Sequence, residues 1–127
     1  MVAVLTPGAR RPSVDLVNPH DNHTSFFVRS QNVLVRVKVK DIRYIHADGN
    51  YCYLFTAHKK YAIKLSLTRL MDRLPNNEFL RIHKSYIVQL KDVNKIDLGS
   101  NSLLLEDVHI PIGRAYRSDL LESLEIL

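Results

Sequence analysis

Short apolar runs with a period of two residues, each closed by turn-forming residues, most constrain the fold of this 127-residue sequence. The run from Val33 to Val39 alternates apolar and basic residues at its end, the pattern of a half-buried strand. Asp48-Gly49-Asn50 is a strong turn signal, since Gly and Asn tolerate positive φ. From Phe26 onward, further strands are predicted at 42–46, 51–56, 61–65, 79–82, 86–88, 93–96, 102–105 and 109–112. So many short strands predict an all-β sheet or sandwich with one or two short helices.

Two segments change to helical spacing. Ser66 is a candidate N-cap for a helix over 67–74, which presents Leu residues and Met71 on one face and is ended by Pro75. The second predicted helix runs from Arg114 to about Leu124. The predicted core consists of Tyr44, Ile45, Leu54, Phe55, Leu70, Leu74, Ile87, Val88 and Ile96.

The chain is long enough for one domain, which we place at residues 25–127. Residues 1–24 hold three of the five prolines and little regular apolar alternation, so we expect a flexible tail or a linker. No signal peptide or membrane-spanning stretch is recognisable. A soluble, cytoplasmic protein without a membrane partner is therefore expected.

Catalytic and metal-binding patterns are missing from the sequence. The six histidines form no His-Glu-x-x-His pattern, and the four glycines are isolated and form no phosphate loop. Cys52, the single cysteine, lies within a predicted strand, as a small buried apolar residue would, and fits a reducing compartment. We therefore expect no enzyme activity, no cofactor and no metal site.

The basic residues favour an anionic partner, since 18 Lys and Arg against 13 Asp and Glu give a formal net charge of +5. The run from Arg81 to Tyr86 mixes charge, ring and hydroxyl in one strand–loop–strand region, while Arg114 and Arg117 open the second predicted helix. Such side chains contact phosphates, and Arg also recognises guanine. At Lys59-Lys60 a solvated surface is at least as good an interpretation. The alternative function is a protein-interaction adaptor that uses the same basic surface.

Four blocks, in order and with matching spacing, resemble the LytTR family of bacterial transcriptional regulators over about residues 26–124. The central block, Arg81-Ile82-His83-Lys84-Ser85-Tyr86-Ile87-Val88, is similar to the family pattern R-x-H-[RKN]-S-[YF]-[IL]-V. The other three blocks lie at 41–51, 66–75 and 110–117.

The resemblance implies an elongated, multi-sheet β fold that places loops, and no recognition helix, in successive major grooves of DNA. It also implies a homodimer on repeated sites and an upstream receiver or sensor partner. By motif position, Arg114 and the Asn50 loop are expected to contact base edges, Arg81, Lys84 and Ser85 to anchor phosphates, and Arg117 to be a further phosphate contact. His83 either contacts DNA or is a packed structural histidine. The complete set of predicted DNA-binding residues is Asn50, Tyr51, Arg81, His83, Lys84, Ser85, Arg114 and Arg117.

Three departures from the family pattern concern the predicted site. His46 stands where Glu is usual, which changes the charge beneath the first loop, and Gln89 stands where Asn is common, which weakens the case for a turn contact there. Gly113 replaces the commoner Ser and removes a hydroxyl beside Arg114. No receiver domain is recognisable, so the chain is either a standalone regulator or a fragment of a longer one.

Overall fold

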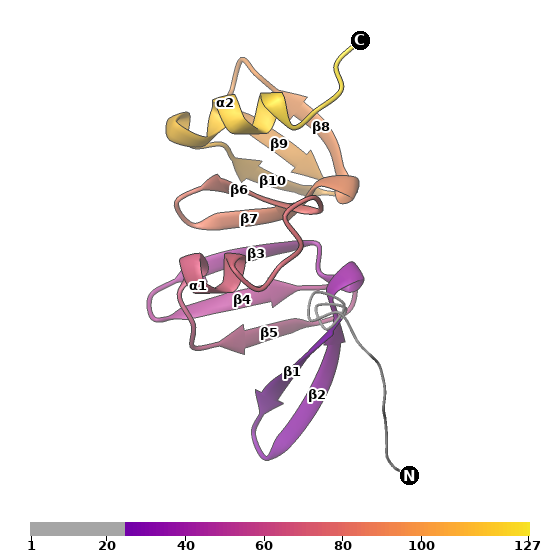
Figure 1. Ribbon diagram of the computed structural model, residues 1–127, viewed down its shortest axis with the longest axis vertical. Helices are drawn as coiled ribbons and strands as arrows, with labels where there is room; N and C mark the ends of the chain where they lie inside the picture. Colours follow the sequence, from indigo (N-terminus) through magenta and orange to yellow (C-terminus); the bar gives the residue numbers. More distant parts are fainter. Residues whose placement is uncertain (1–24) are drawn as a thin grey trace, which may run out of the picture.

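The computed structural model describes residues 25–127, so the tail or linker predicted for residues 1–24 lies outside the described part of the chain. In that part, antiparallel strands form three sheets that follow one another along the long axis of the molecule (Figure 1). At one end lies the hairpin β1 (Ser25–Ser30) and β2 (Val33–Lys38), which leads into the 3₁₀ helix η3 (Val39–Asp41). The mainly β, elongated, multi-sheet architecture confirms the prediction.

The central sheet has the strand order β5-β4-β3-β7-β6. Its strands are β3 (Tyr44–Asp48), β4 (Tyr51–Phe55), β5 (Lys60–Ile63), β6 (Phe79–His83) and β7 (Tyr86–Gln89). The β3–β4 turn has Gly49 at φ +64°, a left-handed conformation that glycine adopts without steric penalty. The β3–β7 pairing, with Ile45 opposite Ile87, joins segments that lie far apart in the sequence.

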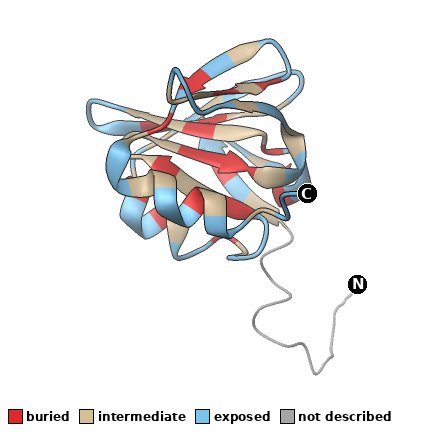
Figure 2. Cartoon of the chain, turned by 90° about the horizontal axis from the view of Figure 1, so that it is seen from above, coloured by how far each residue is buried: buried red, intermediate tan, exposed pale blue. Residues whose placement is uncertain are grey.

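The third sheet has the order β10-β9-β8 and follows the 3₁₀ helix η4 (Leu90–Asp92). Its strands are β8 (Val93–Asp97), β9 (Ser102–Leu105) and β10 (Val108–Pro111). The helices α1 (Leu67–Met71) and α2 (Arg114–Glu122) lie on the same side of the sheets, as Figure 2 shows. No helix in the described range is long and apolar enough to cross a membrane.

Helix α1 is shorter than the 67–74 helix predicted. Ser66 caps it as expected, since its hydroxyl accepts a hydrogen bond of 3.2 Å from the Arg69 N–H. The helix ends at Met71 because the next amides bond three residues back, Arg73 to Leu70 and Leu74 to Met71, which tightens the last turn. Leu74 is nevertheless buried, as predicted.

Two apolar clusters lie on the two faces of the central sheet. One packs the β1–β2 hairpin and α1 around Ile45, Leu54 and Ile87, and the other packs the third sheet and α2 around Val88 and Leu120. Adjacent β7 residues therefore face different cores, as strand alternation requires. Six of the nine predicted core residues are buried. The three that are only half-buried are Tyr44, Phe55 and Ile96.

Candidate nucleic-acid interface

The β3–β4 turn, the β6–β7 turn and the β10–α2 junction lie along one side of the molecule, which we call the loop flank (Figure 1). Backbone hydrogen bonds join them. The Ala47 N–H donates to the Ser85 carbonyl at 2.9 Å, and the Gly113 N–H donates to the Ile82 carbonyl at 2.7 Å. Segments that are far apart in the sequence thus form one linked surface, and each of them carries predicted DNA-contact residues.

The β6–β7 turn lies at the middle of the loop flank. A register shift between Arg81 and His83 places one extra residue on β6, and such bulges change the direction in which side chains near a strand end point. Lys84 is exposed and Ser85 half-buried, so both are available to a ligand. Ile82 is fully buried.

Arg81 is held by contacts within the protein. Its guanidinium donates to the carbonyl of His83 at 3.3 Å, to the carbonyl of Lys84 at 2.6 Å and to the Thr68 hydroxyl at 3.2 Å. The guanidinium carbon also lies 5.8 Å from the centre of the Tyr116 ring. Arg81 thereby joins the β6–β7 turn to both helices, which favours a positioning role over the predicted phosphate contact.

His83 is half-buried, and its Nδ1 accepts a hydrogen bond of 3.1 Å from the Ser85 N–H. Its ring meets the Tyr86 ring edge-on at 5.6 Å. Burial lowers the pKa of His83, and the nearby Lys84 and His46 lower it further. The ring is therefore neutral near pH 7, and a charged contact with phosphate is not its main contribution. The packed, structural alternative gains support from this geometry.

Gly113 lies beside His83 at the β10–α2 junction, where an added side chain would crowd the Tyr116 ring. A Cβ atom at this position would lie 3.2 Å from Cδ2 of Tyr116 and 3.5 Å from the His83 Cα. The next residue, Arg114, is exposed at the first turn of α2. Arg117, in contrast, donates to the Leu98 carbonyl at 3.0 Å and to the Asn101 side chain, so it is bound to the β8–β9 turn.

A groove of about 550 Å³ runs along the loop flank between the β3–β4 turn, α1 and the β6–β7 turn. Exposed Asn50 and Tyr51 line it together with Arg81 and Lys84. Two exposed cations of the groove, Lys64 and Arg69, were missed by the sequence reasoning. The signal was present, because β5 runs antiparallel to β4 and its end must therefore lie beside the β3–β4 turn.

The departures at His46 and Gln89 have structural explanations. The His46 ring stacks on Tyr86 at 4.3 Å, beside the β6–β7 turn. Gln89 makes no surface turn contact, because it is fully buried and its Nε2 donates to the carbonyls of Val39 at 3.3 Å and Ile42 at 3.1 Å. Gln89 thus ties η3 to β7.

Nucleophile and metal chemistry find no obvious place in the described residues. Cys52 is buried, donates its S–H to the Leu65 carbonyl at 3.0 Å, and has a pKa raised by burial, so it is a protonated thiol. Within residues 25–127 no group of three or more His, Cys, Asp or Glu side chains could hold a metal ion.

Cations, an amide and hydroxyls on linked loops are the groups that contact phosphates and base edges of duplex DNA. The loops protrude from a β scaffold, and the helix α1 of five residues is too short to lie along a major groove. The fold and the loop flank therefore define a β-scaffolded nucleic-acid-binding domain.

The model of the LytTr DNA-binding domain matches residues 32–125, and this chain belongs to that family. The heme-containing CO-sensing transcriptional regulator RcoM 1 of Paraburkholderia xenovorans is 30% identical over 105 residues, which cover 79% of this chain and 39% of RcoM 1. The sensory transduction protein LytT of Bacillus subtilis is 26% identical over 113 residues, which cover 86% of this chain and 47% of LytT. This chain thus spans less than half the length of these curated relatives.

Among solved structures, a LytTr DNA-binding domain from Bacillus cereus matches with a TM-score of 0.72 and 20% identity, covering 81% of this chain and 98% of that one. This likeness establishes the shared fold. The predicted family, the mainly β architecture and the DNA-binding class of the domain are confirmed. The family is one of DNA-binding domains. The individual contact residues remain predictions.

Proposed function

We propose that this chain is a bacterial transcriptional regulator, or its DNA-binding part, that recognises specific duplex sequences by placing the loop flank in adjacent major grooves. The observation that carries this proposal is the linkage of the three loops by backbone hydrogen bonds, from Ala47 to Ser85 and from Gly113 to Ile82. The linkage supports a single preorganised contact surface, and preorganised surfaces lose little entropy on binding.

Each side chain takes the role that its surroundings favour. Arg114 is exposed, has no ion pair within residues 25–127 and stands at the helix start, which suits bidentate contact with guanine. Lys84, Lys64 and Arg69 are exposed cations of the loop flank and suit phosphates, while Asn50 suits base edges. Ser85 and Tyr51 add hydrogen bonds at the rim, and the bound guanidinium of Arg117 is a secondary phosphate contact.

The whole protein acts in the bacterial cytoplasm in this proposal, as a homodimer on two repeated half-sites and under the control of an upstream receiver or sensor. Its task is recognition, and we assign no catalytic step to it. A relative that combines sensing with transcription regulation, the CO-sensing transcriptional regulator RcoM 1, supports control by an upstream sensor.

Selection of bound sequences from a random duplex pool tests the proposal and yields the operator. Arg114→Ala is then expected to lower specific binding more than non-specific binding, by about 1–3 kcal/mol of discrimination, while Lys84→Ala lowers both alike. Lys95→Ala, on β8 and outside the loop-flank groove, is the matched control and should change neither. If no enriched motif emerges and Arg114→Ala leaves every affinity unchanged, the loop flank is not a DNA-reading surface and the adaptor alternative takes its place.

A further inference from the structure

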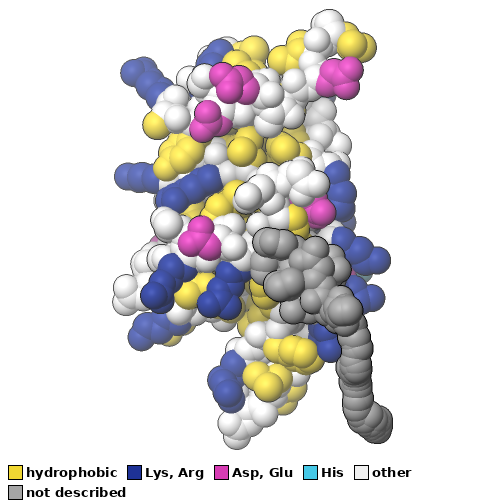
Figure 3. Space-filling model, viewed as in Figure 1, with side chains coloured by type: hydrophobic (Ala, Val, Ile, Leu, Met, Phe, Trp, Pro, Cys, Tyr) yellow, Lys and Arg dark blue, Asp and Glu magenta, His cyan; other side chains and the backbone are white. Residues whose placement is uncertain are grey.

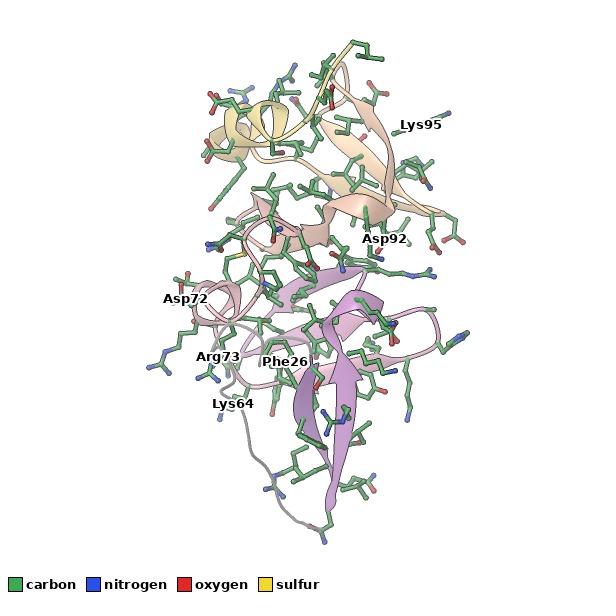
Figure 4. The ribbon with its side chains drawn as sticks, turned by 45° about the vertical axis from the view of Figure 1, so that its right-hand side comes forward. Phe26, Lys64, Asp72, Arg73, Asp92 and Lys95 are labelled. Atoms are coloured by element: carbon green, nitrogen blue, oxygen red, sulfur yellow. The ribbon has the colours of Figure 1, made fainter. Side chains whose placement is uncertain are left out.

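A second groove, of about 530 Å³, lies on the side of the molecule away from the loop flank. We call it the basic groove. The end of β2, η3, the β4–β5 turn and η4 form its walls, and it shares no lining residue with the loop-flank groove. Figure 4 places Lys64 of the loop flank beside α1, and Asp92 of the basic groove on the opposite side. The cations of the basic groove are Arg36, Lys38, Lys40, Arg43, Lys59 and Lys91.

The basic groove is strongly positive. Its six Lys and Arg against two Asp give a net charge of +4, the same as that of the four cations that line the loop-flank groove. Arg43 is paired with Glu106, and Lys91 lies 3.4 Å from Asp92. The other four cations have no ion pair in the described part of the chain. Figure 3 shows Lys and Arg along both edges of the molecule. Concentrated charge of one sign favours an anionic partner.

An apolar patch continues from the basic groove. On the outer face of the β1–β2 hairpin, Phe27 is 58% exposed and Leu34 57% exposed. Strand register puts Arg36 opposite Phe27, with its guanidinium carbon 4.5 Å from the ring centre, and Arg36 also lines the groove. Figure 3 shows hydrophobic side chains over this hairpin. Exposed apolar groups beside cations are typical of a protein-binding surface.

The β4–β5 turn shapes one wall of the groove and is ordered by its own side chain. The Thr56 hydroxyl accepts from the Lys59 N–H at 3.1 Å and donates to the Lys59 carbonyl at 3.0 Å. The Lys59 ammonium lies 5.7 Å from the centre of the Tyr61 ring. This wall of the groove is therefore ordered by contacts within the turn.

We propose that the basic groove and the outer face of the β1–β2 hairpin bind an acidic segment of a second protein that also carries apolar side chains. A phosphate backbone offers no apolar group to Phe27 and Leu34. Carboxylates set among Leu and Phe match the mixture of charge and apolar surface, and such complementarity gives specificity. Because this surface faces away from the loop flank, such a partner and DNA can be bound together.

The probe is a short fluorescein-labelled peptide in which Glu and Asp alternate with Leu and Phe. Fluorescence polarisation measures its affinity for the full chain. Lys40→Ser combined with Lys59→Ser is expected to weaken binding about fivefold, since each exposed charge contact contributes little alone. Arg73→Ser combined with Lys95→Ser removes the same charge outside the groove and should change binding less than twofold, about the scatter of the method. Phe27→Ser combined with Leu34→Ser should weaken this peptide, but not one with Ser in place of Leu and Phe.

Backbone amide shifts in an NMR titration with the peptide should concentrate at residues 36–43 and 56–61. Unchanged affinity of each variant for a selected duplex shows that it is folded and separates this proposal from the function of the loop flank. Equal weakening by the control pair, shifts confined to the loop flank, or no binding at millimolar peptide overturns the proposal. The proposal is also overturned if the Lys40→Ser, Lys59→Ser variant loses more affinity for non-specific duplex or single-stranded DNA than for the peptide. The groove would then be a nucleic-acid surface.

Discussion

Replacing Arg81 by Met and by Lys separates a residue that shapes the loop flank from one that anchors phosphate. The guanidinium makes three hydrogen bonds, to the carbonyls of His83 and Lys84 and to the Thr68 hydroxyl. At about 0.5–1.5 kcal/mol net for each, and with the 3.3 Å bond to His83 the weakest, Arg81→Met should lower the free energy of unfolding by about 2 kcal/mol. Lys has no planar fork and recovers about one of these bonds, so Arg81→Lys should lose about 1 kcal/mol.

The same variants have a distinct signature in DNA binding. A cation that releases counterions from a phosphate contributes about 0.9 to the slope of log affinity against log salt concentration. Because the Arg81 guanidinium is directed at carbonyls within the protein, both Arg81 variants should weaken binding to a selected duplex without changing the slope. Lys84→Met, which removes an exposed cation, should reduce the slope by about 0.9.

Polarisation titrations of the selected duplex over a series of KCl concentrations measure both quantities, and urea unfolding gives the stability. Lys84→Met serves as the positive control for the slope. If Arg81→Lys restores full affinity while Arg81→Met reduces the slope by about 0.9, the side chain is a phosphate anchor and the positioning role is refuted.

Three further outcomes are expected. Since the pKa of His83 is lowered, the folded state binds fewer protons than the unfolded one. The contribution of His83 to stability is thus complete above the ordinary histidine pKa and is lost as the pH falls through that range. The free energy of unfolding, measured from about pH 7.5 to about pH 5, should therefore fall less steeply in the His83→Gln variant than in the unchanged protein. Gln89→Leu leaves the Ile42 carbonyl without its side-chain donor, but the Val39 carbonyl keeps the Ile42 N–H and the buried, unpartnered Oε1 of Gln89 is removed, so stability in urea unfolding should fall by about 1 kcal/mol; equal stability would show that the bonds are dispensable. The proposed phosphate contacts Lys84, Lys64 and Arg69, with Arg117 as the secondary one, predict a salt slope of about 3–4 per protomer, and a much steeper slope would mean that the basic groove also contacts DNA.

Local elements of the fold could be predicted because their causes are local. The turn at Gly49 and the cap at Ser66 both depend on residues close in the sequence, and both occur where the pattern placed them. Strand limits differ by a residue or two, and the predicted strand at 42–46 begins at Tyr44 because η3 holds the chain until Asp41.

The contacts that join the parts of the loop flank involve segments far apart in the sequence. The local sequence pattern therefore could not predict them. Arg81 reaches Thr68 and Tyr116, and Gln89 reaches Val39, contacts between segments that lie far apart in the sequence. No periodicity reports such pairing, and only the resemblance of the four sequence blocks to a known family brought the loops together. The resemblance in turn gave no hint of the basic groove, whose cations are spread from Arg36 to Lys91.

The strand β7 connects the two surfaces. This strand begins at Tyr86, beside the β6–β7 turn of the loop flank, and ends at Gln89, whose side chain holds η3 in the wall of the basic groove. A partner in the basic groove that displaced η3 would therefore act on β7 through two buried hydrogen bonds, and Gln89→Leu would remove that link. Thermodynamic linkage requires reciprocity, so the factor by which peptide changes duplex affinity must equal the factor by which duplex changes peptide affinity. A factor of one in both directions would make the two flanks independent binding sites on one scaffold.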